Sequence, residues 1–258
     1  MNGIINFFVG FISTTIGAIS GIGGGVIIKP VLDMLGQYDI SSIGVLSTFT
    51  VFTMSIVTLI KNLKNKVKLD GRRTIFLALG SIMGGVIGKN IFIGFLQLLN
   101  NDILAQKIQS VILFLLMIVV LILYVKEDKI EGFKVNNVLF CGVVGIVLGI
   151  ISSFLGIGGG PLNVIVLMYI LGMDAKSSAI HSIFIIFFSQ GSKLISILLG
   201  EGLGVYNLDV VLYMIVGGIL GGIVGSNLSN IMDKSQVKNL FKYCMIALIC
   251  FNLYNVVK

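Results

Sequence analysis

Two glycine clusters of identical sequence, GIGGG, interrupt long apolar segments of this chain, at Gly21–Gly25 and at Gly156–Gly160. Glycine costs about 1 kcal/mol relative to alanine inside a helix, so each cluster is expected to break one. Pro161 follows the second cluster directly, where proline suits the first position of a new helix. A helix start presents backbone N–H groups and partial positive charge, which together favour an anion. The predicted anion-binding backbone comprises Gly23, Gly24, Gly25, Gly158, Gly159, Gly160 and Pro161.

Polar side chains within the apolar segments could complete such a site. Lys193 stands well inside one segment with no acid near it in sequence. A lysine there costs roughly 2.5–3.5 kcal/mol on insertion scales and indicates function, unless it snorkels to the interface. Lys29 could reach the first glycine cluster or snorkel likewise. His181, the only histidine, could exchange a proton near neutral pH or simply be a hydrogen-bonded residue. Neutral donors that could contribute are Ser20, Ser47, Thr48, Asn163, Ser182 and Gln190.

No pattern typical of catalysis, nucleotide binding or metal binding is present. A dinucleotide-binding G-x-G-x-x-G would need glycine where Val26 and Pro161 stand, and no P-loop occurs. The three cysteines lie in apolar runs without metal-ligand spacing, and Asp33 is the only acid well inside an apolar segment. The sequence therefore predicts no enzyme, no metal and no cofactor. It also predicts no nucleic-acid partner, because the basic residues cluster between apolar segments.

The elements that must position these residues are membrane helices. The chain is 56% hydrophobic and 11% charged, whereas a soluble domain averages about 25% charged residues. A helix needs about 20 apolar residues to span a bilayer. The sequence therefore predicts an all-α integral membrane protein of about eight transmembrane helices in a lipid bilayer. The predicted spans are 3–20, 41–61, 74–97, 106–125, 136–156, 178–199, 209–230 and 239–257, with shorter apolar pieces at 26–36 and 161–172.

The two halves of the chain resemble each other in sequence. The second GIGGG is accompanied by Asp174, which aligns with Asp39. Later in each half, GSIMGGVIGKN (80–90) matches GGILGGIVGSN (217–227). This order indicates a duplication into an N-terminal repeat (1–125), a linker (126–134) and a C-terminal repeat (135–258), each with a glycine-broken first helix. Four crossings in each half would make the repeats parallel, whereas three or five would make them inverted.

The glycines of the later motif favour close helix packing, and that helix face could also serve a homodimer. The segment KNLKNKVKLDGRR (61–73) is the most basic part of the chain. Under the positive-inside rule it is predicted to be cytoplasmic. An even number of crossings is expected before this segment, so the N-terminus is predicted to be cytoplasmic as well.

The segments SGIGGGVIIKP and LGIGGGPLNVIVL, in a duplicated chain with eight long apolar segments, resemble the sulfite exporter TauE/SafE family over essentially the whole sequence. One departure is that Pro30 stands five residues past Gly25, whereas Pro161 is adjacent to Gly160, so the two halves could form different loops. The resemblance implies transport of small sulfur-containing anions, such as sulfite or sulfoacetate, across the bacterial plasma membrane.

The function expected is therefore a secondary transporter, an exporter that moves a small anion by alternating access around the two glycine breaks. Protons or the membrane potential would drive it, since no ATP-binding motif is present. The alternatives are a passive anion channel, or a carrier of a different small anion such as a carboxylate.

Overall fold

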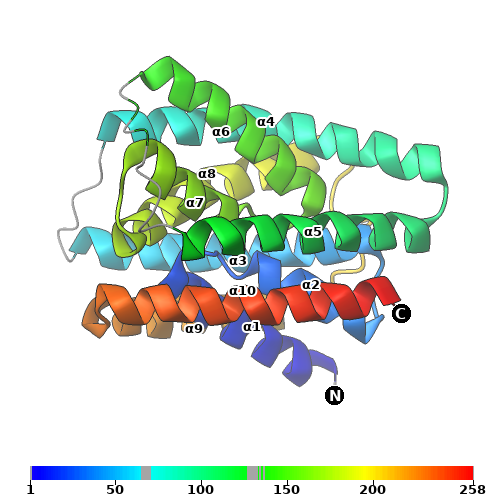
Figure 1. Ribbon diagram of the computed structural model, residues 1–258. Coiled ribbons are helices and arrows are strands. Elements are labelled where there is room, and N and C mark those ends of the chain that lie inside the picture. The colour runs from blue at the N-terminus through cyan, green and yellow to red at the C-terminus, as the bar shows by residue number, and fades with distance from the viewer. Residues whose placement is uncertain (1, 65–70, 127–132, 134, 136, 258) are drawn as a thin grey trace.

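The computed structural model describes residues 2–64, 71–126, 133, 135 and 137–257, which form ten helices and no strand (Figure 1). In chain order these helices are α1 (Asn2–Ser20), α2 (Gly25–Leu35), α3 (Ile40–Lys64), α4 (Gly71–Leu99), α5 (Asp102–Val125), α6 (Val138–Leu155), α7 (Gly160–Leu171), α8 (Ala175–Leu199), α9 (Val211–Ile231) and α10 (Lys234–Val257). Among them, eight are long and apolar enough to cross a membrane, and α2 and α7 are the two shorter ones. The predicted all-α membrane class and the eight long helices are confirmed.

The first glycine cluster turns the chain back on itself. Gly24 packs against the backbone of Ser13 and Thr14 in α1. Tyr38, just beyond the end of α2, is hydrogen-bonded to Asn6 near the start of α1. Because the start of α1 and the end of α2 lie side by side, the two helices form a hairpin whose tip, Gly21–Gly25, is buried within the bundle.

The second glycine cluster does the same for α6 and α7. The N–H groups of Phe133 and Val135, just before α6, donate to the carbonyls of Tyr169 (2.7 Å) and Ile170 (2.8 Å) near the end of α7. The α6–α7 hairpin thus enters and leaves at one end of the bundle. The predicted glycine-broken first helix is therefore present in both halves, despite the different positions of the two prolines.

The two halves run in opposite directions through the bundle. Three full-length helices, α3 to α5, separate the two hairpins, so the second hairpin enters from the end opposite to the first. In Figure 1 both termini and the α4–α5 connection lie toward the right, while the chain leaves α3 and enters α4 at the left. Of the two arrangements left open by the sequence, the observed topology is the inverted one.

This topology corrects the predicted path of the N-terminal segment. An even number of crossings was expected before the basic segment 61–73, but the α1–α2 hairpin returns and α3 alone crosses the bundle. The N-terminus and the basic residues Arg72 and Arg73 therefore lie at opposite ends (Figure 1). Residues 65–70 of the basic segment lie outside the described residues.

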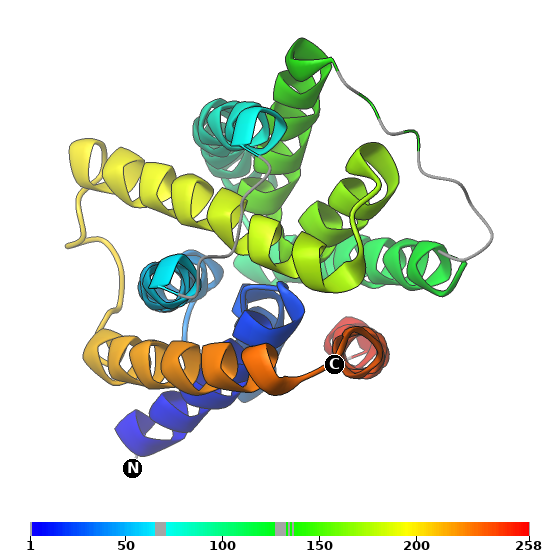
Figure 2. The same cartoon turned by 90° about the vertical axis from the view of Figure 1, so that its left-hand side faces the viewer.

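Glycine faces join helices from different halves of the chain. In Figure 2 the α4–α6 pair and the α1–α9 pair lie on opposite sides of the bundle. Gly84 of α4 packs on the carbonyl of Ile146 in α6, and Gly221 of α9 packs on the carbonyl of Phe11 in α1. The interpretation of these glycines as close-packing residues is confirmed. Both faces are occupied within the chain, and the homodimer stays a prediction.

The division into repeats at residues 126–134 also stays a prediction. Helices from residues 1–125 and 135–258 pack across one another rather than as two separate units, since α4 lies against α6 and α8 while α9 lies against α1 and α3.

Candidate functional site

The two hairpin tips meet in the middle of the bundle. Gly160 packs directly on the carbonyl of Ile22, and Gly25 packs on the carbonyl of Ile157, so each tip contacts the helix start of the other. Ser182 of α8 secures this junction, because its Oγ donates to the carbonyl of Gly21 (2.7 Å) and lies 3.3 Å from the carbonyl oxygen of Gly160. No side chain larger than hydrogen fits at either glycine.

The predicted helix starts are formed as the sequence indicated. Gly24 and Gly159 precede α2 and α7 with left-handed φ angles of 76° and 75°, a conformation that glycine adopts without strain. Pro161 occupies the first turn of α7. Pro30 lies inside α2 instead, so glycine alone is sufficient to start that helix.

A small cavity lies between the tip of the second hairpin and the α8–α9 connection. Its volume of about 50 Å³ is several times the 10–15 Å³ or so that one water molecule needs. Three lysines from three helices line it, namely Lys29 of α2, Lys89 of α4 and Lys193 of α8. Each is buried, with 1%, 7% and 8% of its surface exposed.

The cavity carries an excess of positive charge. Lys29 donates to Gln109 Oε1, and Gln109 Nε2 donates to the carbonyl of Phe154 at 2.6 Å, so the hydrogen-bond partner of this lysine is a neutral amide. The charge of Asp33, one turn further along α2, also acts on Lys29. Lys193 interacts repulsively with the charges of Lys29 and Lys89. Within the described residues that line the cavity, Glu201 is the only acid.

One polar group of the wall is left for a ligand. The hydroxyl of Ser153 is buried and has no hydrogen-bond partner among the described residues, and Lys193 adds its charge to the same wall. A buried cation is costly unless it is paired. A small anion in the cavity would accept from the Ser153 hydroxyl and pair with the charge of Lys193.

The structure brings together two of the predicted site residues from distant segments. Lys29 and Lys193 both line the cavity instead of snorkelling to the surface. The six predicted glycines lie beyond its wall, at the junction of the tips, and Gly156 is the described glycine of the second cluster that borders it.

The predicted neutral donors lie around the junction of the tips. Ser47 Oγ is next to Gly25, and Gln190 Nε2 is next to Gly158. Asn163 is buried beside Gly159. Two of the hydroxyls bond within their own helices, Ser20 to the carbonyl of Ile16 and Thr48 to that of Gly44, both at 2.7 Å.

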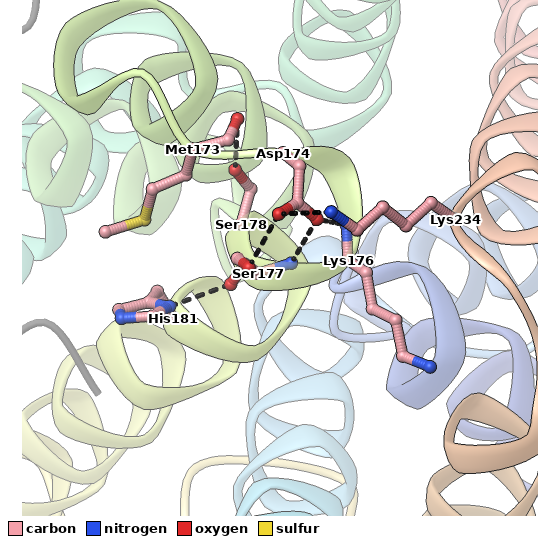
Figure 3. A network of polar contacts seen from close by, with 7 residues as sticks. All are labelled: Met173, Asp174, Lys176, Ser177, Ser178, His181 and Lys234. Atoms are coloured by element: carbon pink, nitrogen blue, oxygen red, sulfur yellow. Dashed lines mark hydrogen bonds and ion pairs between the residues drawn. The ribbon is translucent and has the colours of Figure 1, made fainter. Parts of the chain in front are cut away.

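His181 lies in a separate polar network at the start of α8 (Figure 3). Its Nδ1 is 2.8 Å from the carbonyl oxygen of Ser177. Asp174 caps α8 by accepting from the N–H groups of Lys176 and Ser177, and it pairs with Lys234 Nζ at 3.2 Å. Burial tends to raise the pKa of Asp174, but the hydrogen bonds of Ser177 and Lys234 outweigh it and hold that pKa below its usual value.

Sequence reasoning missed several residues of the cavity: Lys89, Gln109, Ser153, Glu201 and Tyr206. Lys89 carries the signal that identified Lys193, a lysine inside an apolar segment, but it stands in the glycine motif that was interpreted as packing. Glu201 stands in the short polar connection after α8, where an acid is ordinary. Only the fold brings it to Lys89.

Eight helices of membrane length, arranged around two buried hairpins, define a polytopic integral membrane protein. The model of the sulfite exporter TauE/SafE family matches residues 6–252, and the chain belongs to this family. The resemblance found in the sequence is thereby confirmed.

The curated relatives are membrane proteins of the same kind. The probable membrane transporter protein YunE of Bacillus subtilis (strain 168) is 24% identical, over 98% of this chain and 98% of its own length. A probable membrane transporter protein of Methanocaldococcus jannaschii is 29% identical, over 79% of this chain and 75% of its own. No solved structure matches the chain. The family and these names support a membrane transporter and not an enzyme.

Proposed function

We propose that this protein is a secondary transporter that carries a small sulfur-containing oxyanion, such as sulfite, by alternating access. The observation that carries the proposal is the convergence of Lys29, Lys89 and Lys193 on one buried cavity whose described wall contains a single acid. Buried ionisable groups in membrane proteins mark substrate and ion pathways. An anion is the ligand that would relieve the repulsion that Lys193 meets from Lys29 and Lys89.

The size of the cavity favours a compact inorganic anion. About 50 Å³ accommodates the volume of a few water molecules, which suits sulfite better than an organic sulfonate such as sulfoacetate. The same chemistry would accept a small carboxylate, so acetate is the third anion to test.

The packing of the hairpin tips favours a carrier over a channel. The tips touch backbone to backbone at Gly160 and Ile22, so an anion that crossed between them would require the tips to separate. The cavity lies on the side of the junction that carries the α8–α9 connection, so access is from that end. Inverted halves that rock against each other around a central site are a common basis of alternating access.

The charge distribution suggests the orientation in the bacterial plasma membrane. Lys61, Arg72 and Arg73 lie at the end away from the α8–α9 connection, and the positive-inside rule assigns that end to the cytoplasm. The N-terminus is then outside, in place of the cytoplasmic position expected from the sequence. The cavity then lies toward the outer side of the membrane, where an exporter would release its substrate, and protons or the membrane potential would drive the cycle.

The test is flux into proteoliposomes for sulfite, sulfoacetate and acetate, with and without a pH gradient. We expect saturable sulfite flux that follows the gradient, whereas flux linear in concentration would indicate a channel.

Lys193→Gln should weaken sulfite binding about tenfold or more, because a charge-assisted hydrogen bond contributes about 1.5–3 kcal/mol. Lys242→Gln, on the exposed face of α10, makes the same charge change away from the cavity and is the control. Equal affinity in the two variants would remove Lys193 from the site.

A further inference from the structure

The carboxylate of Glu201 bridges two residues at the outer end of the cavity. Its Oε1 lies 3.4 Å from Lys89 Nζ, and its Oε2 accepts a hydrogen bond of 2.6 Å from the Tyr206 hydroxyl. All three residues line the cavity. Lys89 also donates to the carbonyl of Ser196 at 3.2 Å, which holds its ammonium against α8.

This ion pair reaches from the solvent into the bundle. The Glu201 side chain is 40% exposed, whereas that of Lys89 is 9% exposed. The carboxylate therefore enters from the outside and meets a cation that belongs to the cavity. Its position is the one in which an incoming anion would first meet Lys89.

The segment that carries Glu201 is rich in glycine, the residue with the greatest backbone freedom. Gly200, Gly202 and Gly204 flank it, Gly202 has a φ of 73°, and nothing lies within 4 Å of the space beside Gly202 or Gly204. Tyr206 is tied to the carboxylate on the same connection. Burial, followed by the hydrogen bond and the charge of Glu201, raises the pKa of Tyr206, so this hydroxyl stays protonated and donates at neutral pH.

We infer that Glu201 is a tethered anion that closes the outer end of the cavity, and that the transported anion must displace it from Lys89. The inference rests on the proposed function, since it names the event by which the anion enters or leaves. The exchange replaces one negative group at Lys89 by another. The lysine therefore need not be left buried and unpaired, a state that is strongly unfavourable.

A tethered anion and a purely structural ion pair predict opposite effects of neutralising Glu201 on sulfite binding. If the ion pair is only structural, its removal loosens the site and weakens anion binding. If Glu201 competes with the anion for Lys89, its neutralisation strengthens anion binding. Because partly exposed ion pairs are weak, we expect Glu201→Gln to tighten sulfite binding about two- to fivefold.

The experiment uses the full chain in detergent and in proteoliposomes, with Ser41→Cys introduced in the cavity wall. A negatively charged, membrane-impermeant thiol reagent reports on access to this cysteine, and the unmodified chain gives the background from its own three cysteines. We expect Glu201→Gln to accelerate labelling severalfold and to lower the sulfite concentration that protects the cysteine from labelling. Glu201→Asp, which keeps the charge, should retain slow labelling. Asp209→Asn changes the same charge on the same connection outside the cavity wall, and should resemble the parent.

The outcomes separate this inference from the proposed function. Protection by sulfite with no effect of Glu201→Gln on labelling or affinity would overturn the tethered anion and leave the transporter intact. Faster labelling without protection by sulfite, sulfoacetate or acetate would support the closing role and overturn the proposed substrates. Weaker sulfite binding in Glu201→Gln, with an unchanged elution profile on size exclusion, would assign the residue a structural role.

Discussion

Single glycines decide whether the two hairpin tips can meet. A methyl group at Gly160 would fall on the carbonyl of Ile22, which is backbone and cannot rotate away. We expect Gly160→Ala to lower the free energy of unfolding by about 1–3 kcal/mol, the usual cost of overpacking a tight contact. Thermal unfolding in detergent measures it.

The matched control for that variant is Gly94→Ala in α4, where nothing lies within 4 Å of the added methyl. Alanine should stabilise this helix by up to about 1 kcal/mol. Equal midpoints for Gly160→Ala and the parent would mean that the tips are not in backbone contact.

The charge on Asp174 should make stability depend on pH. Asparagine caps helices as well as aspartate does, so Asp174→Asn removes the pairing with Lys234 and keeps the cap. The pKa of Asp174 is lowered by the fold. Its stabilisation is therefore present above the ordinary pKa of about 3.9 and is lost as the pH falls through the lower value.

We expect a small deficit for Asp174→Asn at pH 7, of at most about 1 kcal/mol, because both partners of the pair are partly exposed. The deficit should shrink toward pH 3, as followed by unfolding midpoints in detergent. Asp174→Ala loses the cap too and should stay destabilised at both pH values. A deficit for the asparagine variant that is larger at pH 3 than at pH 7 would contradict this account.

At the scale of helices, the packing of α4 depends on which face each glycine occupies. Gly84 contacts the backbone of Ile146 in α6, whereas the space beside its neighbour Gly85 meets only the carbonyl of Ser189, at an ordinary 3.7 Å. Gly84→Ala should force α4 and α6 apart and lower the unfolding midpoint clearly. Gly85→Ala should be tolerated. Similar midpoints for the two variants would show that the motif does not act through close packing.

The helices themselves were largely predictable from apolar length, but their ends were not. The span predicted at 106–125 corresponds to α5, which begins earlier, at Asp102. It does so because the side chain of Asn101 accepts a hydrogen bond from the N–H of Leu104 (3.0 Å) and caps a polar first turn. Likewise, the span predicted at 74–97 corresponds to α4, which extends from Gly71 to Leu99. Hydropathy counts apolar residues, whereas a capped helix continues into polar ones.

At the scale of the whole molecule, the sequence could place the breaks but not the direction that the chain takes after them. A glycine break is compatible with a kinked span and with a reversal. The reversal is established by contacts between residues far apart in sequence, such as Tyr38 with Asn6 and Phe133 with Tyr169. Hydropathy carries no information on such pairs.

The residues of the candidate site were predictable only in part, because the sequence does not show which segments meet in the fold. Lys29 and Lys193 were identified because a lysine is conspicuous in an apolar segment. Glu201 could not be, because its importance arises from the 3.4 Å approach of a connecting segment to Lys89. Residues that act within one segment can be recognised from the sequence, whereas those that act across segments require the fold.

The inverted topology predicts which ends of the bundle share a side of the membrane. Val205 on the α8–α9 connection is 68% exposed, so Val205→Cys should be labelled by an impermeant maleimide in intact cells. Arg72→Cys, exposed at the start of α4, should be labelled only after permeabilisation, because arginine-rich ends face the cytoplasm. An epitope fused to the N-terminus should be accessible in intact cells, as the cysteine of Val205→Cys is.

If instead Arg72→Cys is labelled in intact cells, while Val205→Cys and the epitope become accessible only after permeabilisation, the topology holds and the orientation is reversed. An epitope that follows Arg72→Cys would instead require α1 and α2 to cross the membrane as one broken span.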